Sequence, residues 1–334
     1  MKEHEIRPAD LTEEYLRQSA ADVAAFFPPG ASRLARSCPA CGGNDHKKAF
    51  VKNSFPFVHC ETCATLFATP APTPEKFFEF YRDSPSQRYF ANVFFPAVEA
   101  TRREKIFKPR AEMIGDLLRR LDISLERVAD VGAGAGLMLD ELRRVQPGVN
   151  YTAVEPHADF AQVCREKGFE TFEGFAADAA TDPDWATQAS LVTSFEVIEH
   201  VLDPEAFVRE LATLARPGGI VLFTGLCGSG FDILALGENS DAVSPPHHLN
   251  FLTRNGVRAL LERCGLEEVE FLTPGRLDVD IVRNKLSDMP DAVSDPFLRQ
   301  VLLESDDETL QAFQLFLAEQ KLSSHMMVVA RTPR

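Results

Sequence analysis

Residues 128–140, VADVGAGAGLMLD, decide how the middle of this chain folds. A short apolar run ends in three glycines, Gly132, Gly134 and Gly136, which are separated by single alanines, and an apolar-periodic segment follows. This order is typical of a β-strand, a tight turn and the start of a helix. Glycine lets the backbone of such a turn adopt positive φ and approach a ligand closely. We therefore predict a ligand-binding turn at this point.

Strands and helices alternate from residue 127 onward. The expected strands cover 127–131, 150–154, 169–172, 190–195, 219–225, 267–272 and 325–331. The expected helices cover 135–145, 157–167, 203–215 and 253–264, with further helical patterning over 279–320. This alternation predicts a doubly wound, Rossmann-like α/β fold built on a parallel sheet.

Three ligands compete for the glycine turn. A P-loop requires Lys-Ser or Lys-Thr after its last glycine, but Leu137 and Met138 stand there, so that class is excluded. A dinucleotide-binding turn reads G-x-G-x-x-G, and this turn is one residue shorter. Asp130 would also place a negative charge near a pyrophosphate. The turn therefore favours a ligand with a cationic group.

The stretch DVGAGAG, residues 130–136, resembles the first motif of class I S-adenosylmethionine (SAM) methyltransferases. Glu155 ends the second expected strand, where this family keeps an acidic residue, and RPGG at 216–219 resembles the turn before its fifth strand. SFEVIEHVLDP at 194–204 resembles the segment after strand four in small-molecule O-methyltransferases, including those of quinone biosynthesis. The resemblance covers residues 110–273 and implies the family's seven-stranded sheet.

The resemblance also implies a SAM site. Its residues, in chain order, are Asp130, Gly132, Gly134, Gly136, Glu155, Phe175, Asp178, Phe195 and Glu196. The first four would hold the methionine part, and Glu155 would hold the ribose hydroxyls. The next two would flank the adenine, and the last two would lie below the sulfonium. From the residues alone, the pattern at Asp178 favours a solvated loop residue over an adenine contact, and Phe175 is equally a core residue.

Four of the seven cysteines form two pairs. Cys38 and Cys41 are followed, after eighteen residues, by Cys60 and Cys63. Two C-x₂-C knuckles at this spacing are typical of a zinc ribbon, and four thiolates complete a tetrahedral site with no open position. We therefore predict a structural zinc. The alternatives are buried free thiols or a redox dithiol.

The charge of the chain bears on nucleic-acid binding. The formal net charge is −15, and residues 33–63 are mildly basic without a dense array of arginines and aromatic residues. We therefore expect a small-molecule partner and neither nucleic acid nor membrane. Two alternatives stay open. One is an RNA methyltransferase that docks RNA through the zinc ribbon, as in ribosomal-RNA enzymes that pair a zinc module with this fold. The other is a non-catalytic zinc- and SAM-binding adaptor.

Histidines are the candidate catalytic residues. Methyl transfer to a hydroxyl needs a base, and histidine suits neutral pH. His200 follows expected strand four, and His247 and His248 follow expected strand five, so chain order brings all three to the carboxyl edge of the sheet. The alternatives are that His200 begins a helix and that one of the pair is a structural hydrogen-bonding residue.

The predicted organisation has five parts. They are an N-terminal helical arm (1–36), a zinc ribbon (37–70), a helical linker or lid (71–122), a SAM-binding core (123–273 plus 323–334) and a helical insertion (274–322). The insertion would stand beside the acceptor pocket or form a homodimer contact. The chain shows no secretory apolar region and no apolar run of membrane length, which predicts a cytoplasmic location. The predicted function is SAM-dependent O-methylation of a small polar metabolite or sugar-linked intermediate.

Overall fold

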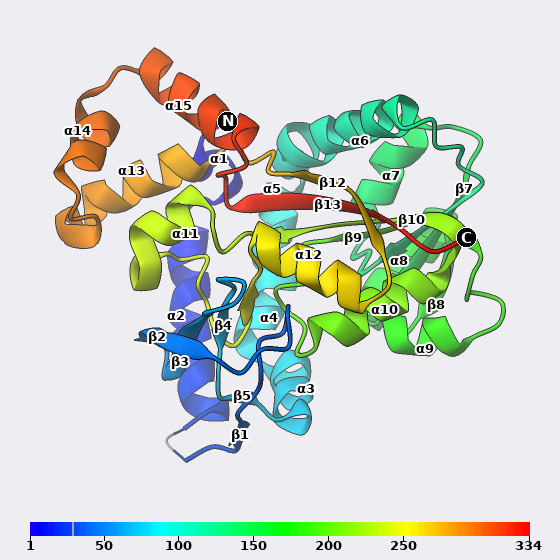
Figure 1. The fold of residues 1–334 in the computed structure, drawn as a ribbon, viewed down its shortest axis with the longest axis horizontal. Helices are drawn as coiled ribbons and strands as arrows, with labels where there is room; N and C mark the ends of the chain where they lie inside the picture. Colours follow the sequence, from blue (N-terminus) through cyan, green and yellow to red (C-terminus); the bar gives the residue numbers. More distant parts are fainter. Residues whose placement is uncertain (29) are drawn as a thin grey trace. The chain divides into compact units, whose positions relative to one another are not determined.

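The structure is a computed structural model that describes residues 1–28 and 30–334. Figure 1 shows the ribbon with colours that follow the sequence. The chain divides into two compact units. The cysteine unit comprises Met1–Thr101, Leu226–Val257 and Leu272–Met326. The sheet unit comprises Arg102–Gly225, Arg258–Phe271 and Met327–Arg334. The five parts predicted above stay a prediction, and the two units are described separately.

A seven-stranded sheet dominates the sheet unit. Its strands are β6 (Arg127–Val131), β7 (Asn150–Glu155), β8 (Glu170–Glu173), β9 (Ala189–Phe195), β10 (Ala215–Leu226), β12 (Glu267–Leu272) and β13 (His325–Arg331), in the spatial order β12-β13-β10-β9-β6-β7-β8. Strand β6 pairs in parallel with both β7 and β9, and β7–β8 and β9–β10 are also parallel. The chain therefore winds outward from β6 in both directions, as predicted, and β6 marks the switch point where ligands bind in such sheets.

The predicted turn at 216–219 is part of an irregular strand. The pairing of β10 with β9 shifts register between Ala215 and Ile220, and Gly218 has a φ of 71°. Residues 216–219 are therefore a bend within strand β10 and not a turn before it. The apolar pattern marks only the regular part of this strand, so the sequence predicted a later start.

Helices alternate with these strands along the chain. They are α6 (Lys108–Arg120), α7 (Leu137–Val145), α8 (Ala158–Glu166), α9 (Ala176–Thr181), α10 (Pro204–Leu214) and α12 (Arg254–Arg263). Helices α7 and α8 contact β7, and α10 contacts β9. Helix α10 begins at Pro204 because Asp203 caps it: the Asp203 side chain accepts from the Glu205 and Ala206 N–H groups at 3.0 and 3.1 Å. Pro204 has no N–H group, so the first position of the helix leaves no donor without a partner.

The cysteine unit holds a small antiparallel sheet. Its strands are β2 (His46–Lys52), β3 (Phe55–Cys60), β4 (Leu66–Ala68) and β11 (Asn250–Phe251), in the order β11-β4-β3-β2, and β1 (Arg33–Leu34) pairs with β5 (Ala71–Pro72). Strand β11 comes from far along the chain, with Asn250 opposite Phe67. The predicted ribbon therefore shares its sheet with β11, a later segment of the chain. A strand of two residues has no recognisable sequence pattern, so the sequence analysis could not predict this pairing.

Helices make up the rest of the cysteine unit. They are α1 (Glu3–Ile6), α2 (Ala9–Phe26), α3 (Pro74–Asp83), α4 (Pro85–Tyr89), α5 (Phe95–Arg102), α11 (Phe231–Leu236), α13 (Asp278–Asp288), α14 (Pro296–Glu304) and α15 (Asp307–Glu319). A π-helical turn, Phe90–Phe94, follows α4 in this unit, and a second one, Arg103–Phe107, precedes α6 in the sheet unit. The helical stretch predicted over 279–320 is three helices, because Asp295 and Asp306 cap new ones. Among the described residues, no helix has the length and apolar character needed to cross a membrane.

Candidate functional site

The glycine turn follows β6 directly. Gly132, Gly134 and Gly136 have φ values of 74°, 54° and 69°, where other residues are strained. A Cβ on Gly132 would lie 2.8 Å from the Val197 side chain, and one on Gly136 would lie 3.1 Å from the Cys164 sulfur. A Cβ on Gly134 would meet no atom within 4 Å. The outer glycines therefore allow close packing, whereas the middle one borders open space that a ligand can fill.

Cys164 of helix α8 and Lys167, just after it, hold the glycine turn through hydrogen bonds. The Cys164 thiol donates to the Gly134 carbonyl at 3.2 Å, and the Lys167 ammonium, just past the helix, donates to the Ala135 carbonyl at 2.7 Å. Two consecutive carbonyls of the turn are thereby fixed by side chains about 30 residues away. The sequence analysis missed both residues, since neither belongs to a recognisable motif.

Glu155 ends β7 beside the turn and is 6% exposed. One carboxylate oxygen accepts from the Gly134 N–H at 2.7 Å, and the other accepts from the His157 N–H at 2.9 Å. Burial raises the pKa of this carboxyl, and the two backbone bonds oppose the shift. Each oxygen can accept a second bond, so the oriented carboxylate can receive a pair of hydroxyls.

Asp130 lies near the end of β6 and is 2% exposed. The Thr193 hydroxyl on neighbouring β9 donates to Asp130 Oδ1 at 2.7 Å. Burial raises the Asp130 pKa to about 7, and the nearby Glu155 charge acts in the same direction, against the Thr193 bond. A buried carboxyl held this way is suited to a cationic group, which would stabilise its ionised form.

Phe195 and Glu196 lie where β9 ends, and Glu196 has a φ of 56°. The Thr224 hydroxyl on β10 donates to Glu196 Oε1, and the buried Arg110 guanidinium of α6 lies 3.2 Å from the same oxygen. Arg110 also lies 5.6 Å from the centre of the Phe195 ring. The predicted pair is thus fixed by Arg110 and Thr224, which the sequence analysis did not identify.

Phe175 and Asp178 begin helix α9. Phe175 is 52% exposed, and Asp178 accepts from the Phe175 N–H at 3.2 Å through its side chain. Asp178 is exposed, as its alternative had it, but it lies in a helix that it caps and not in a loop. Phe175 is not the core residue that was its alternative. Their contact with an adenine stays a prediction.

Of the three candidate histidines, His200 lies in the sheet unit, and His247 and His248 lie in the cysteine unit. In the sheet unit, His200 is half-buried in a turn after β9, where its N–H donates to the Val197 carbonyl at 2.9 Å. In the cysteine unit, the half-buried His248 has its Nδ1 at 2.6 Å from the Ala242 carbonyl. A carbonyl can only accept, so Nδ1 carries the proton and Nε2 is the basic nitrogen of the neutral ring.

His247 is a core residue of the cysteine unit and is 1% exposed. Its Nδ1 lies 3.0 Å from the Gln87 amide nitrogen and its Nε2 lies 3.4 Å from the Ser86 hydroxyl. Burial lowers the His247 pKa to about 3, and the neighbouring His248 acts in the same direction. The ring is therefore neutral and hydrogen-bonded on both nitrogens. His247 is therefore a structural hydrogen-bonding residue, the role that the sequence analysis gave as the alternative for either His247 or His248.

The four predicted cysteine ligands meet in the cysteine unit. Their sulfurs all lie within 4.8 Å of one another, with Cys38 and Cys63 3.5 Å apart and Cys41 and Cys60 3.4 Å apart. Sulfurs around one zinc, at about 2.3 Å from it, are about 3.8 Å apart. Each knuckle bends through a left-handed residue, Gly42 or Ala64, whose N–H donates to the carbonyl of the knuckle's first cysteine at 2.9 Å. The four sulfurs thus lie close enough together to hold one metal ion.

Comparison with known proteins identifies the family. The family described as "Methyltransferase domain" matches residues 100–270, which is half of the chain. The chain belongs to this family. A ubiquinone biosynthesis O-methyltransferase from Xanthomonas oryzae pv. oryzae is 33% identical over 111 residues, which cover 32% of this chain and 46% of that protein. The protein of the same name from Xanthomonas euvesicatoria pv. vesicatoria is 28% identical over 158 residues, covering 44% of this chain and 65% of that protein.

The similarity to these curated relatives is confined to part of each protein. The chain spans about half the length of the Xanthomonas oryzae relative, 46%. Among solved structures, the plantazolicin methyltransferase BpumL in complex with SAH is similar with a TM-score of 0.48 and 13% identity, over 77% of this chain and 94% of that chain. The family is thus established by the methyltransferase domain at 100–270, which contains the glycine turn, Glu155 and Glu196.

We expect Asp130→Asn to stabilise the ligand-free methyltransferase domain at pH 8. Burial raises the Asp130 pKa from 3.8 to about 7, so between these values the native state binds a proton that the unfolded chain has released. Stability is therefore lost as the pH rises from about 4 to about 7, with an upper limit of about 4 kcal/mol. Asparagine keeps an oxygen for the Thr193 bond and removes the titration.

Urea unfolding of both proteins at pH 5 and pH 8 measures this effect. The advantage of the variant should be larger at pH 8, and the exposed Asp184→Asn should show no such pH dependence. An advantage of equal size at both pH values would mean that Asp130 does not titrate in this range.

Proposed function

We propose that the protein is a SAM-dependent methyltransferase that methylates an oxygen of a small polar metabolite or sugar-linked intermediate. The observation that carries this proposal is the open space at Gly134, bordered by the buried Glu155 carboxylate in a domain that belongs to the methyltransferase family. The open space at Gly134 lets a ligand approach the backbone of the turn.

The residues of the turn fit SAM. Asp130 would hold the methionine ammonium, since a cation would favour the ionised form of this buried carboxyl. Glu155 would accept bonds from the ribose hydroxyls through the oxygens that Gly134 and His157 already orient. Phe195 and Glu196 would line the floor below the sulfonium, fixed by Arg110 and Thr224. SAM supplies an activated methyl group, so the main task of these residues is to position donor and acceptor.

A hydroxyl acceptor is supported by the relatives, which are named as O-methyltransferases. Such an acceptor loses a proton, and we propose a histidine as the base. His248 is favoured over His247 because the Ala242 carbonyl fixes its tautomer, whereas the His247 pKa of about 3 makes that ring a weak base. His200 is kept as the second candidate. The helices between β12 and β13, α13 to α15, are proposed as an insertion that borders the acceptor or joins a homodimer.

We also propose that the four cysteines hold one structural zinc. The donor set is four thiols with no position for a water or substrate, and the sulfur separations fit a tetrahedral ion. A structural zinc contributes its binding free energy to folding, which suits a sheet of short strands.

Metal analysis should find about one zinc per chain. Cys60→Ser should release it and lower the thermal stability of the cysteine unit, because one thiolate of four is lost, while SAM binding by the sheet unit is retained. Cys264→Ser removes a thiol outside the cluster and should keep the zinc. Equal stability of metal-free and native protein would reject a structural zinc.

Calorimetry with SAM, its demethylated product and NAD tests the cofactor. We expect binding of the first two and none of NAD. An adaptor without activity would bind SAM but transfer no label from methyl-labelled SAM to any metabolite in an extract. An RNA methyltransferase would transfer label to RNA, with substrate binding that weakens steeply with salt. Transfer to a small hydroxyl compound, insensitive to salt, is the result that the proposal requires.

A further inference from the structure

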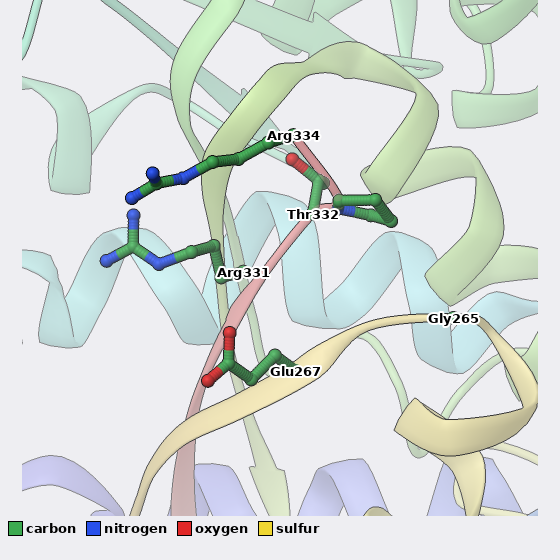
Figure 2. A pocket seen from close by; sticks show the side chains of 6 residues that line it. Gly265, Glu267, Arg331, Thr332 and Arg334 are labelled. Atoms are coloured by element: carbon green, nitrogen blue, oxygen red, sulfur yellow. The ribbon is translucent and has the colours of Figure 1, made fainter.

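A groove of 580 Å³ opens on the sheet unit, where β13 ends beside the start of β12. It is lined by Gly265, Glu267, Arg331, Thr332, Pro333 and Arg334 (Figure 2). This is the size of a small-molecule site. A second hollow of 180 Å³ shares Arg331 and reaches the amino end of β10 at Arg216 and Gly218.

This groove is remote from the glycine turn. The turn follows the carboxyl end of β6, whereas the second hollow, which shares Arg331 with the groove, lies at the amino end of β10, a strand that runs parallel to β9 and hence to β6. The five residues of β6 alone separate the two edges of the sheet by about 17 Å. The groove is therefore no part of the methyl-transfer site.

Two arginines and one glutamate line the groove. Figure 2 shows the Arg331 and Arg334 guanidinium groups extending to the same side of the β13 ribbon, with the Glu267 carboxylate on the neighbouring strand. Over residues 1–28 and 30–334, the salt bridges at 4.0 Å or less involve neither arginine. Guanidinium groups donate parallel N–H bonds to phosphate, so two of them lining one groove can bind an anion there.

The backbone that carries these arginines is fixed in place. The Thr332 N–H donates to the Gly219 carbonyl at 3.0 Å, and its buried hydroxyl donates to the Arg216 carbonyl at 2.8 Å. The Gly218 N–H donates to the Pro333 carbonyl at 2.8 Å, and Arg331 Nη1 donates to the Gly218 carbonyl at 3.2 Å. The irregular start of β10 therefore anchors residues 331–333, and the exposed Arg334 follows them directly.

We propose that this groove binds the phosphate group of a small phosphorylated metabolite that also carries a hydroxyl. Arg331 and Arg334 donate to the phosphate, for which planar guanidinium groups are the preferred partners. Glu267 accepts from the hydroxyl and disfavours a bare anion. The site lies outside the methyl-transfer machinery, so the ligand is an effector and not the acceptor.

Inorganic phosphate and glycerol 3-phosphate are the probes, titrated into protein with ¹⁵N-labelled arginine at low salt and pH 7.5. The Arg331 and Arg334 Nε–H signals should shift saturably, with dissociation constants of about 1 mM for phosphate and tighter binding of the ester. Arg331→Gln and Arg334→Gln should each weaken binding about tenfold. Arg165→Gln removes an exposed arginine that pairs with Glu173 and is the matched control.

Glu267→Gln separates the two parts of the proposal. It should tighten inorganic phosphate a few-fold by removing a like charge, and it should abolish the preference for glycerol 3-phosphate. No saturable shift up to about 20 mM would overturn the proposal, as would equal weakening by Arg165→Gln. Vesicles with phosphatidylglycerol test the other source of phosphate. Retention of the protein on them, lost in Arg331→Gln, would replace the metabolite with a lipid headgroup.

Discussion

Replacing Gly134 with valine is expected to lower SAM affinity roughly 100-fold or more. The φ of 54° at this position is unfavourable for a β-branched residue, and the added side chain would enter the open space beside the turn. Because no protein atom lies within 4 Å of the place that a Cβ would take, the side chain competes with the ligand and not with the core. Titration calorimetry with SAM measures the loss, and thermal melting shows that the variant is folded.

Gly148→Val is the matched control. Gly148 lies in the sheet unit with a φ of 83° and no atom within 4 Å of its Cβ position, so valine introduces the same kind of backbone strain there. We expect both variants to lose a similar small amount of stability and only Gly134→Val to lose SAM binding. If Gly134→Val binds SAM as well as Gly148→Val does, the turn does not hold the cofactor.

The strand and helix pattern of the sheet unit was predictable because it depends on local signals. All seven strands lie within a few residues of their predicted positions. The central strands β6, β7, β9 and β10 are buried parallel strands, which appear in sequence as apolar runs between turns. Strand β11 was missed because two residues carry no periodicity, and its pairing with β4 joins positions more than 180 residues apart. The π-helical turn at Phe90–Phe94 was missed because its side-chain pattern is that of an ordinary helix.

The site residues that could be predicted belong to recognisable sequence motifs. The residues that were missed lie on other helices or strands and hold the motif residues in place through hydrogen bonds. Asp130 and Glu155 follow from their positions at strand ends. Cys164 and Lys167 hold the turn through bonds to its carbonyls, which no sequence spacing reveals. Burial is equally hidden, because the neutral core environment of His247 comes from helices α3 and α4, some 160 residues earlier.

His248→Ala is expected to lower turnover by roughly 10²- to 10⁴-fold, the usual contribution of a general base, while SAM affinity stays nearly unchanged. A hydroxyl acceptor must lose its proton as the methyl arrives, and the residues proposed to bind SAM are assigned to holding the cofactor and not to accepting this proton. The pH–rate profile should lose its acidic limb, because protonation of the base is what inactivates the enzyme at low pH. The measurement uses the acceptor found with methyl-labelled SAM.

His248→Asn separates a base from a structural residue. Its amide can still donate to the Ala242 carbonyl, as Nδ1 of His248 does at 2.6 Å, but it has no basic nitrogen. A base therefore requires that asparagine be as inactive as alanine, whereas recovery of turnover in His248→Asn would assign His248 to holding its loop. His200→Ala is measured beside them. Loss of the acidic limb in that variant alone would move the base to His200, and near-native turnover in all three would mean that the acceptor is already nucleophilic and needs no base.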